Sequence, residues 1–110
     1  MLPPLEVKLT DEEIVKKYFE DIPEMVDVAY CESRFRQFEK DGKVLRGIID
    51  NDDSGILQIN RRYHEKEAKE LGYDIDTLMG NLKYGRYLYE KEGIKPWKAS
   101  SKCIEARQSG

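Results

Sequence analysis

The sequence predicts an α+β fold in which a mainly α-helical domain carries a small antiparallel β-sheet. Apolar residues recur at helical spacing before residue 36 and again after residue 60, whereas turn signals and short apolar runs fill the segment between them. Helices that flank a small sheet in this order are typical of the α+β class. With 110 residues, the chain is long enough for one modest hydrophobic core. We expect a single domain over residues 1–110, with an extended arm at 1–9 and a loose tail at 104–110.

Two helices are expected in the first third of the chain. Thr10 and Glu13 have the spacing of a capping box, and the apolar residues that follow form one side of a helix: Ile14, Val15, Tyr18 and Phe19. Pro23 suits the first turn of a second helix, which we expect to run to about Phe35.

The segment after residue 40 carries strand and turn signals instead. Asp41 and Gly42 indicate a turn, and the apolar pairs at 44–45 and 48–49 indicate a short strand-like stretch. We expect a polar turn at 50–55 and a second strand at 56–59. These stretches would pair as a small antiparallel sheet between the helices.

Three further helices are expected after residue 60. The first two end at Gly72 and Gly93, which suit helix C-termini, and Asp76 or Thr77 caps the second of them. Pro96 opens a last short helix.

The only histidine is expected to have a structural role. His64 shares a helix face with Ala68 and Leu71, so we expect a partly buried, hydrogen-bonded side chain. No further ligands are spaced around His64 for a metal site, and we expect no metal.

Composition and charge exclude several classes of protein. The chain is 39% hydrophobic and 37% charged, with a formal net charge of -3. The charges are interspersed and no basic block occurs, which argues against a nucleic-acid partner. No apolar run approaches the roughly 20 residues of a membrane span. The first residues do not resemble a signal peptide, so we expect either a cytosolic protein or one whose export segment is absent from this chain.

The two cysteines, Cys31 and Cys103, lie far apart and form no Cys-x-x-Cys motif. This spacing indicates neither a zinc ribbon nor thioredoxin chemistry. Paired, they would close a long loop, worth about 4 kcal/mol on a chain-entropy argument, and would imply an exported protein. Unpaired, they would be two small buried side chains. The residues alone leave both states open.

Glu32 stands where the expected second helix should be apolar. It follows Met25, Val28 and Ala29 at helical spacing, which places its carboxyl on the buried face. Burial raises the pKa of a carboxyl group, and a carboxylic acid that stays protonated near neutral pH suits general acid catalysis. Alternatively, Glu32 pairs with a core arginine or reaches past the end of the helix. The outward positions hold Asp27, Tyr30 and Arg34, as expected for a solvated face.

A cluster of acidic residues follows in the expected polar turn. If the turn faces Glu32, then Asp50, Asp52 or Asp53 would supply the second carboxylate of a glycosidase. The alternative is that Asp and Asn are simply good turn residues. The same stretch matches the first positions of a calcium loop, but Arg61 stands where that loop requires a bidentate Glu.

Two motifs together resemble the lysozyme-like superfamily. Glu32-Ser33 with the nearby Phe35, followed by the strand motif Gly-Ile-Leu-Gln-Ile-Asn at 55–60, is similar to soluble lytic transglycosylases and to chicken-type lysozymes. Asp53, two residues before that motif, and the later Trp97 also resemble the chicken-type enzymes. The resemblance covers about residues 22–103. It further suggests that Cys31, near the catalytic helix, pairs with Cys103, near the end of the domain.

The resemblance implies a lysozyme-like fold with the small sheet beside an active-site cleft. The implied function is cleavage of the β-1,4 bond between N-acetylmuramic acid and N-acetylglucosamine in peptidoglycan. Glu32 would be the general acid and Asp53 a second catalytic carboxylate. The candidate substrate-binding residues are Ser33, Gln58, Ile59, Asn60, Tyr63, Tyr87 and Trp97. No cofactor is implied, and the expected partner is a peptidoglycan glycan strand bound by a monomer.

Several features depart from the family pattern. Pro96-Trp97-Lys98-Ala99 stands where lytic transglycosylases have an Ala-Tyr-Asn motif, and at most one cysteine pair replaces the four of the animal enzymes. The link between Glu32 and Asp53 is longer than in those enzymes.

A non-catalytic glycan- or partner-binding module on this scaffold is the alternative. The expected location is extracellular or periplasmic, or the protein is phage-delivered.

Overall fold

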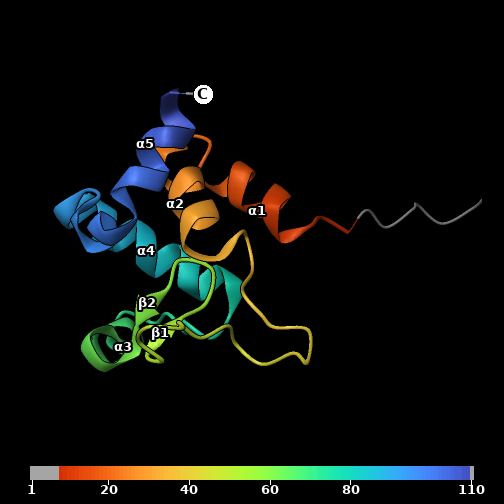
Figure 1. Cartoon of the computed structure of the whole chain (residues 1–110). Coiled ribbons are helices and arrows are strands. Elements are labelled where there is room, and N and C mark those ends of the chain that lie inside the picture. The colour runs from red at the N-terminus through yellow and green to blue at the C-terminus, as the bar shows by residue number, and fades with distance from the viewer. Residues whose placement is uncertain (1–7, 110) are drawn as a thin grey trace, which may run out of the picture.

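A computed structural model describes residues 8–109 of the chain, and Figure 1 shows the order of their helices and strands. Most of the predicted arm at 1–9 lies outside these residues. The helices are α1 (Asp11–Tyr18), α2 (Pro23–Ser33), α3 (Arg61–Glu70), α4 (Leu78–Glu92), the 3₁₀ helix η1 (Lys95–Ser100) and α5 (Ser101–Ser109). The strands β1 (Asp53–Ser54) and β2 (Ile59–Asn60) form a two-stranded antiparallel sheet. The predicted α+β class, mainly helical with a small antiparallel sheet, is therefore confirmed.

The first two helices begin where their caps predicted. Thr10 and Glu13 form the reciprocal capping box, and Pro23 occupies the first turn of α2. However, α2 ends at Ser33, two residues earlier than expected. The backbone at Arg34 and Phe35 turns left-handed, with φ of 56° and 63°, which stops the helix there.

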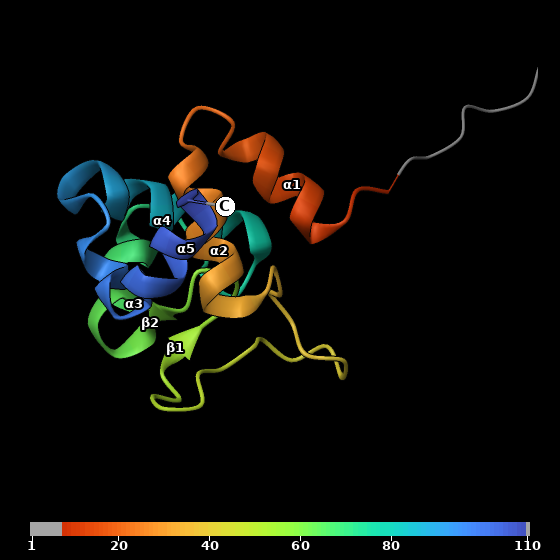
Figure 2. The same cartoon turned by 45° about the horizontal axis from the view of Figure 1, so that its top comes forward.

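The predicted strands at 44–49 and 56–59 are largely wrong. Residues 44–49 make only two isolated bridges, Phe38 to Val44 and Arg46 to Ser54. Residues 55–58 form the turn between β1 and β2, so that β1 falls inside the expected polar turn. Two buried side-chain amides, described below, bond the backbone of this turn and take the place of a neighbouring strand. Figures 1 and 2 show the long segment between α2 and β1 bowing away from the helices.

The predicted helices after residue 60 are present. Thr77 caps α4 through Gly80, Gly93 ends it, and the predicted hydrogen bond of His64 is made to the Tyr84 hydroxyl at 2.9 Å. The last expected helix is divided into η1, which carries Trp97, and α5, which carries Cys103.

The loose tail expected at 104–110 is wrong for the described residues 104–109, which are helical. Cys103 forms a disulfide with Cys31, Ile104 is buried, and Arg107 pairs with Asp27 of α2 at 2.8 Å. These contacts hold α5 against α2, and both views show the two helices side by side. Long-range contacts of this kind have no local signal in the sequence.

The core joins the β-turn to the helices. Leu57 is fully buried, and its Cδ1 would lie only 2.1 Å from a Cβ at Gly85, so α4 needs a glycine where the turn packs against it. Trp97 Nε1 donates to the Leu57 carbonyl at 2.9 Å. The turn is therefore held between α4 and η1. In the part of the chain that the structure describes, no helix is long and apolar enough to cross a bilayer.

Candidate active site

Glu32 lines a hollow of about 440 Å³, which we call the Glu32 hollow. Its walls come from the end of α2, the segment beside β1, the sheet itself and the end of η1. The residues that line it are Glu32, Arg36, Leu45, Arg46, Gly47, Ile48, Ile49, Asp53, Gln58, Ala99 and Ser100. The two carboxylates singled out from the sequence, Glu32 and Asp53, therefore share one hollow.

The Glu32 carboxyl is half-buried and hydrogen-bonded. Burial raises the pKa of Glu32, a hydrogen bond from Ser100 opposes this rise, and the negative charge of Asp53 adds to it. Ser100 Oγ donates to Glu32 Oε2 at 2.6 Å. Among the described residues, Glu32 forms no ion pair with an arginine, so the alternative of a core pair does not apply. The result is a carboxyl group with a raised pKa beside an open hollow.

The opposite face of α2 is less solvated than the sequence suggested. Asp27 and Tyr30 are half-buried, because Arg107 of α5 pairs with Asp27 and lies over the Tyr30 ring at 4.0 Å. Only Arg34, among the three predicted outward residues, is exposed.

Asp53 is held on β1 by a side chain from the opposite strand. Asn60 Nδ2 donates to Asp53 Oδ1 and to Asp50 Oδ2, both at 3.0 Å. Asp53 pairs with Asn60 in the sheet register, so these two side chains lie on one face of the sheet. The sheet therefore presents Asp53 to the hollow in a fixed position.

The neighbouring acidic residues are engaged elsewhere. Arg62 pairs with Asp50 at 3.0 Å and with Asp52 at 2.6 Å. The backbone N–H of Asp52 is the main cause that holds the pKa of Asp50 below its ordinary value, with Arg62 and Asn60 acting in the same direction. Within residues 8–109, no three His, Cys, Asp or Glu side chains converge as a metal site would require.

A second hollow of about 420 Å³, the Trp97 hollow, adjoins the first at Asp53 and Gln58. Tyr63 is 72% exposed on one wall, while Trp97 is only 3% exposed. Two adjoining hollows that share a wall can hold an extended ligand on both sides of Asp53. The other lining residues are Ile59, Asn60, His64, Leu88, Glu92, Lys95 and Pro96.

The predicted substrate-binding residues thus divide into two groups. Gln58, Ile59, Asn60, Tyr63 and Trp97 come together around the Trp97 hollow. The remaining two, Ser33 and Tyr87, do not line either hollow.

Ser33 has a structural place instead. It is 3% exposed, and its Oγ donates to the Ile56 carbonyl at 2.7 Å, which ties the end of α2 to the β-turn. Tyr87 packs against Tyr84, and the Lys91 ammonium lies over its ring.

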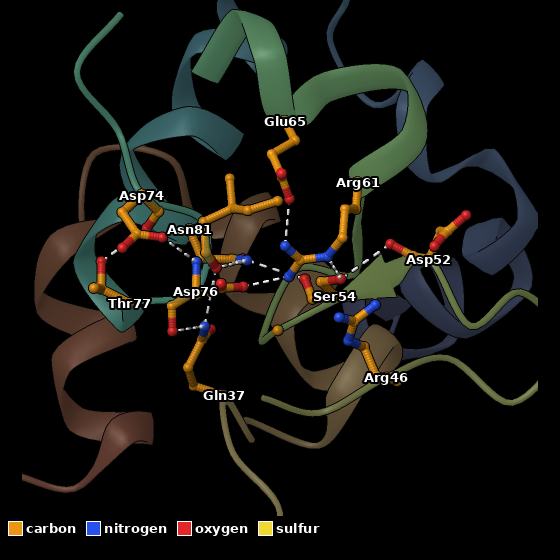
Figure 3. Close-up of polar contacts among 12 residues, drawn as sticks. Gln37, Arg46, Asp52, Ser54, Arg61, Glu65, Asp74, Asp76, Thr77 and Asn81 are labelled. Carbon is orange, nitrogen blue, oxygen red and sulfur yellow. Dashed lines mark hydrogen bonds and ion pairs between the residues drawn. The ribbon is translucent and has the colours of Figure 1, made fainter. Parts of the chain in front are cut away.

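Sequence reasoning missed the polar residues that position the sheet, and Figure 3 shows them in one network. Gln37 accepts from the Ile56 N–H at 2.8 Å, and Asn81 accepts from the Leu57 N–H at 3.0 Å. Both side chains are fully buried. In the same view Arg61 lies between Glu65 and Asp76. The sequence carried a signal only for Asn81. It is a polar residue next to Leu82 on the apolar side of α4, where a buried, hydrogen-bonded side chain could have been expected.

Ser100, Arg36 and Arg46 were also missed as site residues. Each is distant from Glu32 or in an irregular segment, so no local pattern marked them.

No family model, curated protein or solved structure matches this chain in the comparisons with known proteins.

Proposed function

We propose that this protein is a glycosidase that cleaves the β-1,4 bond between N-acetylmuramic acid and N-acetylglucosamine in peptidoglycan, with Glu32 as its general acid. One observation carries the proposal: a half-buried glutamate with a raised pKa shares an open hollow with a second carboxylate. Two carboxyl groups on one groove, one of them with a raised pKa, are the equipment of glycoside cleavage. Lysozyme itself is the type case of this chemistry, so the pattern is a precedent and supplies no magnitude for this chain.

The proposed reaction begins with proton transfer. Protonated Glu32 donates its proton to the glycosidic oxygen as the bond from that oxygen to C1 of the muramyl sugar breaks. The positive charge that develops on the ring is stabilised by Asp53, which lines the same hollow and is held by Asn60. A water molecule then adds hydroxide to C1, and its proton returns to Glu32.

A second route needs only one carboxylate. In it, Glu32 first protonates the leaving glycosidic oxygen, and the bond from that oxygen to C1 breaks. The 6-hydroxyl oxygen of the muramyl sugar then attacks C1, and the hydroxyl proton passes to the Glu32 carboxylate. The product is a 1,6-anhydro sugar, which is one water lighter than the hydrolysis product. We favour hydrolysis, because Asp53 lies in the Glu32 hollow despite its distance along the chain.

Sugar binding is assigned to the Trp97 hollow. The exposed ring of Tyr63 offers an apolar face for a pyranose ring to stack on. Half-buried His64, whose pKa is lowered by burial, offers a neutral imidazole beside it. A glycan chain would run from this hollow past Asp53 to Glu32.

The motifs that resemble lysozyme-like enzymes add to the proposal. Glu32 and the 55–60 motif are distant in the sequence, yet Glu32 and Gln58 line one hollow, as a shared catalytic cleft requires. The Cys31–Cys103 disulfide is typical of proteins in oxidising compartments, which is where peptidoglycan is found. We therefore propose an extracellular or periplasmic site of action, or delivery by a phage.

The test is mass spectrometry of soluble fragments after digestion of purified peptidoglycan. The proposal predicts hydrated muropeptides from the parent and a loss of release with Glu32→Gln. Anhydro fragments would move the proposal to the one-carboxylate route, and Asp53→Asn would then leave turnover unchanged. If neither parent nor variant releases fragments but both bind the glycan, the chain is a binding module and the proposal is wrong.

A further inference from the structure

Two arginines and two isoleucines line the Glu32 hollow without a part in the proposed reaction. Arg36 follows α2, whereas Arg46, Ile48 and Ile49 belong to the segment that runs beside β1. All four share the hollow with Glu32. A ligand that reaches Glu32 therefore lies next to two cations and an apolar pair.

The charges of both arginines are available to a ligand. Arg36 Nε donates to the Ser33 carbonyl at 2.9 Å, and Arg46 Nη1 donates to the Asn51 carbonyl at 3.0 Å. These bonds position the side chains but leave their charges uncompensated. Across residues 8–109, neither arginine forms an ion pair, whereas four other arginines do: Arg61, Arg62, Arg86 and Arg107. A guanidinium without a carboxylate partner can bind a ligand carboxylate through two parallel hydrogen bonds.

The isoleucines are unusually exposed for their type. Ile48 and Ile49 are 102% and 103% exposed, so the fold covers neither side chain. A single exposed apolar residue is ordinary, but two adjacent ones on the wall of a hollow form a small apolar contact surface. Their burial against a ligand would be favourable, because it removes apolar area from water.

We infer that this side of the hollow binds the peptide stem carried by the muramyl sugar, a short acidic peptide with small apolar side chains. The inference rests on the proposed function, since the stem is attached to the sugar whose bond is cut. Carboxylates of the stem would pair with Arg36 and Arg46, and its methyl groups would contact Ile48 and Ile49. The enzyme would thereby prefer stem-bearing glycan over naked glycan.

An anionic bilayer also suits arginine beside isoleucine. The position of these residues favours the stem, because they line the hollow that contains Glu32 and Asp53. A bilayer bound at this place would cover the hollow that the glycan has to enter.

The experiment compares intact peptidoglycan with the same glycan after an amidase has removed its stems. Two double variants are used, Arg36→Gln with Arg46→Gln, and Ile48→Ser with Ile49→Ser. The matched control is Lys66→Gln with Lys83→Gln, which removes two positive charges from exposed helix positions outside the hollow. Circular dichroism establishes that each variant is folded.

The parent is expected to cleave the stem-bearing glycan about tenfold faster, in kcat/KM, than the stripped glycan. Each double variant should lose most of this preference while its rate on the stripped glycan stays unchanged. The lysine control should keep the parent's preference for the stem-bearing glycan. Equal rates of the parent on both glycans, or variants that lose activity equally on both, would overturn the inference.

Binding separates this inference from the proposed function. Titration calorimetry of Glu32→Gln with a soluble stem-bearing muropeptide and with the stripped sugar measures the preference without turnover. A preference that the arginine variant abolishes supports the inference even if no glycan is cleaved, and no preference overturns it. Co-sedimentation with vesicles of phosphatidylglycerol and phosphatidylethanolamine completes the test. Vesicle binding that Ile48→Ser with Ile49→Ser removes, without a stem preference, would assign the surface to a bilayer instead.

Discussion

Ser100 Oγ donates a hydrogen bond of 2.6 Å to Glu32 Oε2, across 68 positions of sequence. Ser100 ends η1, three residues before Cys103, and Cys103 is bonded to Cys31, the residue before Glu32. A covalent bond and a hydrogen bond thus hold the same two segments together. In the proposed reaction, a protonated Glu32 that accepts this bond at Oε2 would carry its proton on Oε1.

Ser100→Ala is expected to move the pH dependence of cleavage. The hydrogen bond from Ser100 stabilises the carboxylate and lowers the pKa of Glu32, so its removal raises that pKa further. The proposed acid is active when protonated, and its activity is lost as pH rises through the pKa. The alkaline limb of the kcat/KM profile should therefore shift to higher pH in Ser100→Ala and stay in place in Ser100→Thr. If the alkaline limb of the kcat/KM profile did not shift in either variant, Ser100 would have no influence on the acid that limits the rate, contrary to this prediction.

Glu32→Gln is expected to stabilise the fold at neutral pH. Burial raises the folded-state pKa of Glu32 above its ordinary value of 4.5, so the folded state binds the proton more tightly than the unfolded chain. The resulting stability is fully present below the unfolded pKa and is lost as pH rises through the folded pKa. The Tm of Glu32→Gln should therefore exceed that of the parent at pH 7, by a margin that shrinks toward pH 4. If the difference in Tm between Glu32→Gln and the parent grew as the pH was lowered, the folded-state pKa of Glu32 would be lowered instead of raised, contrary to this prediction.

Replacement of both cysteines by serine should lower the free energy of unfolding by about 2–4 kcal/mol, since the disulfide closes a long loop between α2 and α5. Urea unfolding, monitored by circular dichroism, measures this loss. Thiol titration of the denatured, unreduced parent is the accompanying control and should find no free thiol.

The double cysteine variant should also lose activity beyond its loss of stability. Glu32 and Ser100 each lie within three residues of a bonded cysteine. Loss of the disulfide should let α5 move relative to α2 and weaken the hydrogen bond between Ser100 and Glu32. An activity equal to that of the parent, measured well below the Tm of the variant, would contradict this positional role.

Asn81→Leu is expected to cost about 2–3 kcal/mol of stability, because it leaves buried backbone groups without hydrogen-bond partners. The Asn81 side chain accepts from the Leu57 N–H and donates to the carbonyls of Ser54 and Ile75, and it is fully buried. Exposed Asn51→Leu is the matched control and should change stability by less than about 0.5 kcal/mol. Equal effects of both substitutions in urea unfolding would contradict the role assigned to Asn81.

Local signals predicted the helices well. The Thr10–Glu13 capping box, the cap at Thr77 and the glycine stop at Gly93 act within a few residues, and each helix end lies where these residues indicated. The place of Glu32 on the inner side of α2 was also readable, because the helix period alone sets it.

The sheet and the tail could not be predicted in the same way. The sequence predicts a strand at 56–59 where the structure has the turn at 55–58, because the side chains that shape the backbone of this turn, Gln37 and Asn81, are distant in the sequence. The helix at 104–109 depends on Cys31 and Asp27 of α2. Ser100 is a comparable case, since only the fold brings it to Glu32.

The most direct test of the proposed function is the initial rate of muropeptide release from purified peptidoglycan by Glu32→Gln, beside the parent and Glu90→Gln. Glu90 is an exposed glutamate of α4 outside both hollows, so its substitution controls for the charge change. We expect a fall of at least about 100-fold for Glu32→Gln, as follows from loss of a general acid, and a parental rate for Glu90→Gln. A Glu32→Gln protein that releases muropeptides at the parental rate would contradict the assignment of Glu32 as the acid.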